Sequence, residues 1–76
     1  MSVGNNIKKF RKEMNISQEE LAEAIKCTVD TISRYETGRR CPSLEQAMRL
    51  SAYFRKSIDL IFYMEPDFPN EKGGPS

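Results

Sequence analysis

The stretch SQEELAEAIKCTVDTISRYETG, residues 17–38, is typical of two short helices joined by a turn of two residues. Ser17 and Glu20 form a capping-box pattern, in which each side chain bonds the backbone N–H of the other and starts a helix. Thr28 is a favoured N-cap for the second helix. We expect that helix to end at Gly38, because glycine readily adopts the left-handed conformation that closes helices.

The turn between these helices consists of Lys26 and Cys27 alone. Two residues cannot bring the helices antiparallel, so the chain must turn sharply between them. That arrangement is a helix-turn-helix.

Similar capping and turn residues divide the rest of residues 1–64 into helices, and no segment between them alternates apolar and polar residues as a strand does. Helices are predicted from Asn5 to about Met14, from Ser43 with Gln46 in a second capping box, and over Ile58 to about Phe62. The expected core positions are Ile7, Phe10, Met14, Leu21, Ala22, Ile25, Leu44, Ala47, Leu50 and Phe54. The sequence therefore predicts one compact all-α, five-helix domain over residues 1–64, followed by a mobile acidic tail rich in proline and glycine over 65–76.

Composition narrows the class of protein. A chain of 76 residues holds one small core, and a net charge of +1 neither requires nor excludes a nucleic acid. Histidine is absent, and no phosphate loop or nucleophile elbow occurs, so we expect no enzyme, metal site or cofactor. The two cysteines suit free thiols, and without a signal peptide or membrane span the sequence predicts a cytoplasmic protein.

Three stretches, SQEELA, TISRYETGRRCPSLE and SIDLIF, resemble the Cro and lambdoid-repressor family, also called the XRE type. The resemblance covers about residues 5–62. It implies a lambda-repressor-like DNA-binding domain, usually dimeric, whose third helix enters the major groove of double-stranded DNA.

The third predicted helix has one side for the core and one for a ligand. Ile32 and Tyr35 are its large apolar groups after Val29, so their side must face inward. The outward side and the resemblance together give the candidate base-reading residues Val29, Asp30, Ser33 and Arg34. The resemblance also gives the candidate phosphate-binding residues Gln18, Thr28, Thr37 and Arg39, to which charge and position add Arg40.

Several of these residues have a second interpretation. Asp30 either favours the helix dipole, pairs with Arg34, or accepts a hydrogen bond from cytosine N4. Gln18 is either a phosphate contact or an ordinary solvated residue of a first turn. A further basic group, Lys8, Lys9 and Lys12, is better explained as the solvated face of the first helix.

The resemblance also implies a structural ion pair between Arg11 and Glu36, which would lock the third helix against the first. Lys26 departs from the family pattern, which commonly has glycine in the turn. A lysine with positive φ there would cost about 1 kcal/mol, or the turn has another shape.

The function expected from these features is sequence-specific DNA binding by a transcriptional regulator, more specifically a repressor that binds a two-fold operator as a homodimer. The candidate dimer interface comprises Ile58, Ile61, Phe62, Tyr63, Met64 and Phe68, although ordinary core packing also explains apolar residues at helical spacing. The alternative function is an antitoxin-like or coactivator-like module of the same fold that binds another protein.

Overall fold

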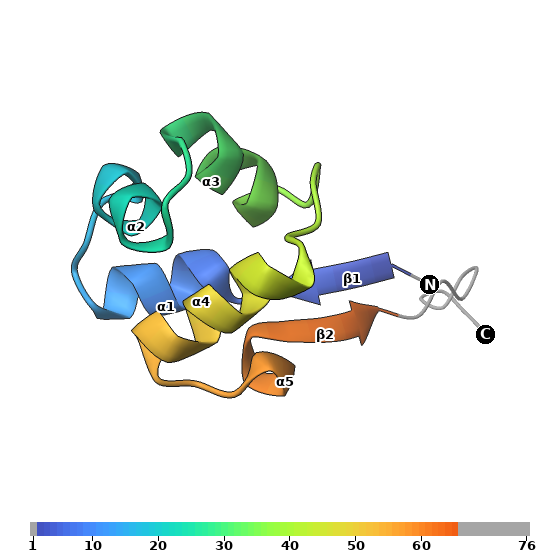
Figure 1. Cartoon of the computed structure of the whole chain (residues 1–76). Helices are drawn as coiled ribbons and strands as arrows, with labels where there is room; N and C mark the ends of the chain where they lie inside the picture. The colour runs from blue at the N-terminus through green and yellow to red at the C-terminus, as the bar shows by residue number, and fades with distance from the viewer. Residues whose placement is uncertain (1, 66–76) are drawn as a thin grey trace.

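The computed structural model describes residues 2–65, which form five helices and two short strands (Figure 1). In chain order these are β1 (Ser2–Asn5), α1 (Ile7–Glu13), α2 (Gln18–Ile25), α3 (Val29–Glu36), α4 (Leu44–Phe54), α5 (Ile58–Ile61) and β2 (Phe62–Glu65). The five expected helices are confirmed, and no helix within residues 2–65 is long and apolar enough to cross a membrane. Positions 66–76, including the candidate interface residue Phe68, lie outside the described residues.

The expectation of an all-α fold is wrong where the described chain begins and ends, because β1 and β2 pair as an antiparallel sheet (Figure 1). Ser2 lies opposite Glu65, and Val3 lies opposite Met64. The backbone becomes extended at Phe62, with φ −119° and ψ 144°, so the last helix ends one residue earlier than expected. Strands of four residues are too short to show an alternating pattern, and their pairing joins distant parts of the sequence.

Capping interactions explain where the helices begin. The Glu20 N–H donates to Ser17 Oγ at 3.0 Å and the Ser17 N–H donates to Glu20 Oε1 at 2.8 Å, which confirms the first capping box. Thr28 Oγ1 accepts the backbone N–H three residues further on at 3.1 Å. The second box is only half formed: Ser43 Oγ accepts the Gln46 N–H at 3.2 Å, whereas Gln46 Oε1 is buried with no hydrogen-bond partner in residues 2–65.

The core lies between the five helices and follows the expected pattern with two exceptions. Its buried apolar residues are Ile7, Phe10, Leu21, Ala22, Ile25, Ile32, Tyr35, Ala47, Leu50, Phe54 and Ile61. Met14 and Leu44, both expected inside, are 42% and 74% exposed. Met14 is the C-cap of α1 and Leu44 is the first residue of α4. Each belongs to the apolar stripe of its helix but lies at the helix end, beyond the part that packs against the core.

Candidate nucleic-acid interface

The turn between α2 and α3 is fixed by its backbone conformation and by two hydrogen bonds. Lys26 has φ 62° and ψ 54°, so a lysine adopts the left-handed conformation that glycine favours. The Cys27 N–H donates to Ala22 O at 2.9 Å, and Arg49 Nη1 of α4 donates to Ile25 O at 3.1 Å. Ala22 O thus accepts from Cys27 as well as from the N–H of the C-cap residue Lys26, and Arg49 satisfies Ile25 O, a carbonyl at the end of α2 with no donor inside the helix.

Helix α3 presents one buried and one exposed side. Ile32 and Tyr35 are 0% and 3% exposed and pack into the core, as expected. The candidate base-reading residues on the other side are Val29, which is 39% exposed, Asp30 and Arg34, which are exposed, and Ser33, which is half-buried. A helix held by one apolar side leaves short side chains at its leading end free to approach a surface closely.

Asp30 and Arg34 form an ion pair across one turn of α3. Arg34 Nε lies 3.0 Å from Asp30 Oδ2, and the two side chains are 56% and 72% exposed. Such an exposed pair contributes only about 0.3–0.5 kcal/mol to stability, because water and salt screen it. Its main effect is to hold the guanidinium along the outward side of α3.

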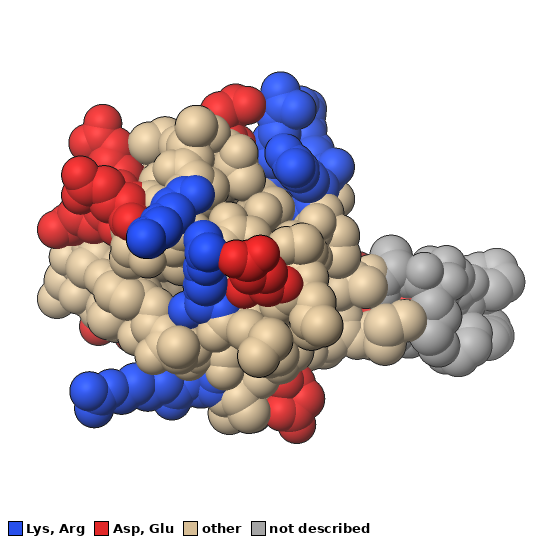
Figure 2. All heavy atoms as spheres, in the orientation of Figure 1, with Lys and Arg blue, Asp and Glu red and all other residues tan. Residues whose placement is uncertain are grey.

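The turn after α3 gathers positive charge next to this side. Gly38 has φ 78°, as expected for a left-handed closing residue, and the N–H groups of Arg39 and Arg40 donate to Arg34 O at 2.9 and 3.2 Å. The side chains of Arg34, Arg39 and Arg40 are exposed. Figure 2 shows basic side chains clustered over the end of α3, and acidic side chains over α2. The positive potential is therefore concentrated at one end of the candidate surface.

The two candidate phosphate-binding threonines flank α3. The Thr28 hydroxyl caps the helix and lies 2.9 Å from Thr31 Oγ1, and Thr37 Oγ1 donates to Ser33 O at 3.0 Å. Both threonines are exposed. The structure thus places them at the two ends of α3, with their hydroxyls held by local bonds.

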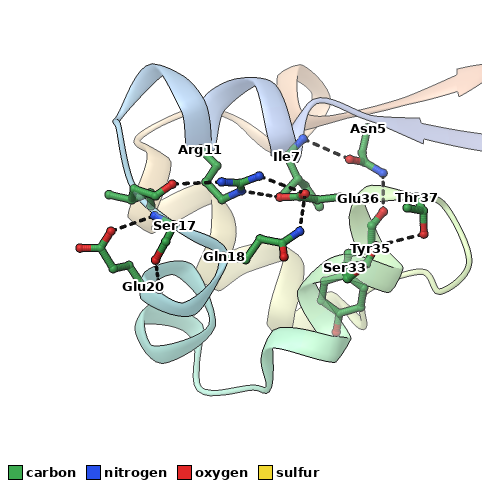
Figure 3. Close-up of polar contacts among 11 residues, drawn as sticks. Asn5, Ile7, Arg11, Ser17, Gln18, Glu20, Ser33, Tyr35, Glu36 and Thr37 are labelled. Atoms are coloured by element: carbon green, nitrogen blue, oxygen red, sulfur yellow. Dashed lines mark hydrogen bonds and ion pairs between the residues drawn. The ribbon is translucent and has the colours of Figure 1, made fainter.

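Glu36 and Arg11 form the expected ion pair, and Gln18 joins it (Figure 3). Arg11 Nε donates to Glu36 Oε2 at 2.7 Å and Arg11 Nη2 donates to Glu36 Oε1 at 3.3 Å. Arg11 Nη1 donates to Ile16 O at 3.0 Å, and Gln18 Nε2 donates to Glu36 Oε1 at 3.0 Å. One cluster therefore connects α1, the start of α2 and the last turn of α3. The family resemblance implied the ion pair but not its contact with Gln18.

Asn5, expected as the first residue of the first helix, lies at the end of β1 instead, and its contact with α3 was not expected. Its Nδ2 donates to Tyr35 O at 2.8 Å, while its Oδ1 accepts the Ile7 N–H at 3.1 Å (Figure 3). Asn5 therefore ties β1 to the end of α3 and starts α1. The bond to Tyr35 O could not be predicted from a local pattern, because it joins residues 30 positions apart.

An open groove of about 650 Å³ lies between α1, α2 and α3. Its lining includes Lys8, Lys12, Gln18, Val29 and Thr37. Lys8 and Lys12 are exposed, as their interpretation as a solvated face requires. No group of metal-ligating side chains occurs within residues 2–65. The groove is open to solvent, so it offers a surface for a large ligand and does not enclose a small one.

Burial raises the pKa of the Cys27 thiol, and the positive charge of Arg40 opposes that effect. Cys27 is half-buried and packs against the core beside the turn, whereas Cys41 is exposed. Both are free thiols. Cys27 is thus a small structural group of the helix-turn-helix.

The candidate dimer residues divide into exposed and buried groups. Ile58, Tyr63 and Met64 are 38%, 43% and 59% exposed. Phe62 is half-buried against the core. Ile61 is fully buried in the core of the monomer, so its assignment to an interface is wrong: it lies inside, where α5 ends and β2 begins.

Two helices joined by a tight turn, with the second held by one apolar side next to an arginine-rich turn, define a DNA-binding helix-turn-helix domain. Comparison with known families agrees, because a model of the helix-turn-helix family matches residues 7–61. The chain belongs to this family, of the XRE type expected from the sequence. Its members are DNA-binding transcriptional regulators and not enzymes.

Three relatives cover most of the chain. A protein of Methanothermobacter thermautotrophicus is 44% identical over 62 residues, which cover 80% of this chain and 90% of that protein. A protein of Archaeoglobus fulgidus is 36% identical over 61 residues, with 80% and 86% covered. One of Methanocaldococcus jannaschii is 35% identical over 63 residues, with 83% and 96% covered. Each is named as an uncharacterized HTH-type transcriptional regulator.

Proposed function

We propose that this protein is a repressor that binds a two-fold DNA operator as a homodimer, with α3 of each protomer in the major groove. The observation that carries the proposal is the exposed side of α3 with the basic turn directly after it. Val29, Asp30, Ser33 and Arg34 read bases. Phosphates are bound by Gln18, Thr28, Thr37, Arg39 and Arg40.

The side chains on α3 suit particular base edges. Val29 has no hydrogen bond to offer and fits a thymine methyl group. Arg34 offers parallel donors to guanine O6 and N7, and Asp30 accepts from cytosine N4 or holds Arg34 in place. The half-sites lie one helical turn, about 10 base pairs, apart on one face of the duplex.

Homodimerisation is supported by the exposed apolar residues of α5 and β2, which are Ile58, Tyr63 and Met64. Phe62, next to Tyr63, is half-buried and packs against the core. Val3 lies opposite Met64 in the sheet and is 43% exposed, so it extends the face that carries Met64, whereas the adjacent Tyr63 lies on the other face. A dimer would cover these groups and bring two recognition helices to adjacent turns of DNA.

The deciding experiment selects binding sites from random DNA with the purified protein and then maps the protected bases. The expected result is a two-fold sequence with two protein chains bound. Arg39→Ala should reduce the slope of log affinity against log salt by about 0.9, because one phosphate contact is lost. Arg55→Ala is the matched control, since Arg55 is exposed at the end of α4 and should leave the slope unchanged.

A selected site without two-fold symmetry, or one chain per site, would contradict the homodimer. A reporter promoter that contains the selected site tests repression: its transcription should fall when the protein is present, and a rise would show an activator. Failure to enrich any sequence would reject specific DNA binding altogether.

A further inference from the structure

We propose that Glu36 is a positioning residue for DNA binding, because its buried carboxylate holds the side-chain amide of Gln18 in the one orientation that turns an N–H group toward a phosphate. This inference rests on the proposed function, in which Gln18 contacts the DNA backbone. Glu36, the last residue of α3, would then orient a side chain of α2. The family resemblance gave Glu36 only a structural ion pair with Arg11.

The chemistry of the two side chains fixes which atoms of Gln18 face Glu36. An ionised carboxylate accepts hydrogen bonds and has none to donate. Gln18 therefore contacts Glu36 Oε1 through its NH₂ group, at 3.0 Å, and cannot present its carbonyl there. The amide is thus fixed in one of its two flip states. Its carbonyl oxygen points away from Glu36, and the NH₂ group keeps a second N–H that this hydrogen bond does not use.

The Glu36 carboxylate is itself buried and held in place by Arg11. The Glu36 side chain is 4% exposed, and two nitrogens of Arg11 bind its two oxygens at 2.7 and 3.3 Å. The arginine neutralises the carboxylate and prevents it from rotating. A negative charge close to the DNA surface would normally oppose phosphate binding. In this pair its charge is compensated, and only its geometry acts on Gln18.

Gln18 lies in the first turn of α2. The capping box engages the N–H groups of Ser17 and Glu20. First-turn N–H groups have no acceptor within their own helix, so Gln18 contributes its backbone N–H to the same end of α2. Arg11 Nη1 also donates a hydrogen bond to Ile16 O, just before this turn. The backbone and the amide of Gln18 are therefore held from two sides by one cluster.

The cluster of Arg11, Gln18 and Glu36 lies in the groove between the first three helices. Gln18 and Glu36 line the same open groove as Val29 and Thr37, between α1 and the recognition helix. A phosphate bound by Gln18 is therefore connected to the last turn of α3 through a single hydrogen bond. The cluster sets the position of α3 relative to the DNA backbone, and Glu36 does so without touching DNA.

The test is a double-mutant cycle for operator affinity with Gln18→Ala and Glu36→Gln. In the wild-type background Gln18→Ala should weaken binding about tenfold, the loss expected for one hydrogen bond to a charged acceptor. A glutamine at position 36 can donate to the Gln18 carbonyl and so releases the fixed orientation. In the Glu36→Gln background, Gln18→Ala should therefore weaken binding less than about threefold.

Arg34→Ala provides the matched background, because Arg34 lies on the same helix and makes no contact with Gln18 among the described residues. There Gln18→Ala should keep its full tenfold effect. If its effect is also tenfold in the Glu36→Gln background, Glu36 is only structural and the proposal is overturned. If Gln18→Ala has no effect in the wild type, the proposal is overturned too, while the salt dependence of Arg39→Ala still tests DNA binding independently.

A second measurement serves if Glu36→Gln does not fold. In the wild-type protein without DNA, the Gln18 NH₂ protons should exchange slowly with water, as measured by NMR. The comparison is Asn15, which is exposed. Exchange as fast at Gln18 as at Asn15 would mean that the carboxylate does not hold the amide, and would overturn the proposal.

Discussion

Arg11 and Glu36 are paired almost out of contact with water, with side-chain exposures of 11% and 4%, whereas Asp30 and Arg34 are paired largely in solvent. Removing one partner of a buried pair leaves the other charge uncompensated, at a cost of about 3–5 kcal/mol. Arg11→Ala should therefore lower the free energy of unfolding by about that amount, measured by urea denaturation without DNA. Arg34→Ala is the control and should cost less than about 1 kcal/mol. Equal unfolding midpoints for Arg11→Ala and wild type would contradict the assigned role.

Asp30→Ala should change DNA recognition more than stability. The loss of one exposed ion pair and one first-turn acid costs roughly 0.3–1 kcal/mol of stability. Without the carboxylate, preference should relax at one base position and affinity for non-specific DNA should rise, because a negative charge has left the interface. Site selection from random DNA measures both. Identical selected sequences would leave Asp30 with a local structural role alone.

Lys26→Gly should stabilise the protein by about 0.5–1 kcal/mol, because the lysine holds a left-handed conformation at φ 62° that costs a residue with Cβ more than it costs glycine. Thermal unfolding measures the change. The control is Ala24→Gly in the exposed part of α2, which should destabilise by about 1 kcal/mol. Equal losses at both positions would show that the turn conformation carries no strain.

Met64→Glu should weaken the homodimer, since it places a charge on the apolar surface of β2. Sedimentation over a range of protein concentrations should show dissociation at a concentration at least about tenfold higher than for wild type. Leu44→Glu is the matched control, because Leu44 is 74% exposed on α4 outside the proposed interface. A monomeric wild type, or equal effects of both changes, would exclude this surface.

The two cysteines should differ in reactivity. Because burial raises the pKa of Cys27, a smaller fraction of its thiol is ionised at mildly alkaline pH, and the thiolate is the reactive form. Iodoacetamide at about pH 8 should therefore modify exposed Cys41 first. Mass spectrometry of the digested protein gives the order, and unfolding in urea should remove the difference. Faster modification of Cys27 in the folded protein would contradict its placement.

The helices could be predicted because their determinants are local. Ser17 and Thr28 cap helices through residues three positions away, and Ile32 with Tyr35 shows which side of α3 must be buried. A periodic pattern does not say where neighbouring elements stop, which is why Leu44 was assigned to the core but is exposed.

The remaining features depend on contacts between distant residues. The bond between Asn5 and Tyr35 O requires β1 to be in place, and β1 exists only through its pairing with β2. The bond between Gln18 and Glu36 connects the start of one helix to the end of the next. Both side chains have ordinary local explanations as polar surface groups, so only the three-dimensional arrangement distinguishes their roles.

The sheet also has a consequence for how the chain acquires its structure during synthesis. Asn6 Nδ2 donates to Leu60 O at 2.9 Å across 54 positions, and its N–H donates to Ile61 O at 2.7 Å. At about 5–20 residues per second, a ribosome therefore releases the first strand seconds before its partner exists. The contacts of β1 with β2 can form only after β2, the last element of the described chain, has left the exit tunnel. The pairing of the two strands is thus the last long-range contact to become available during synthesis.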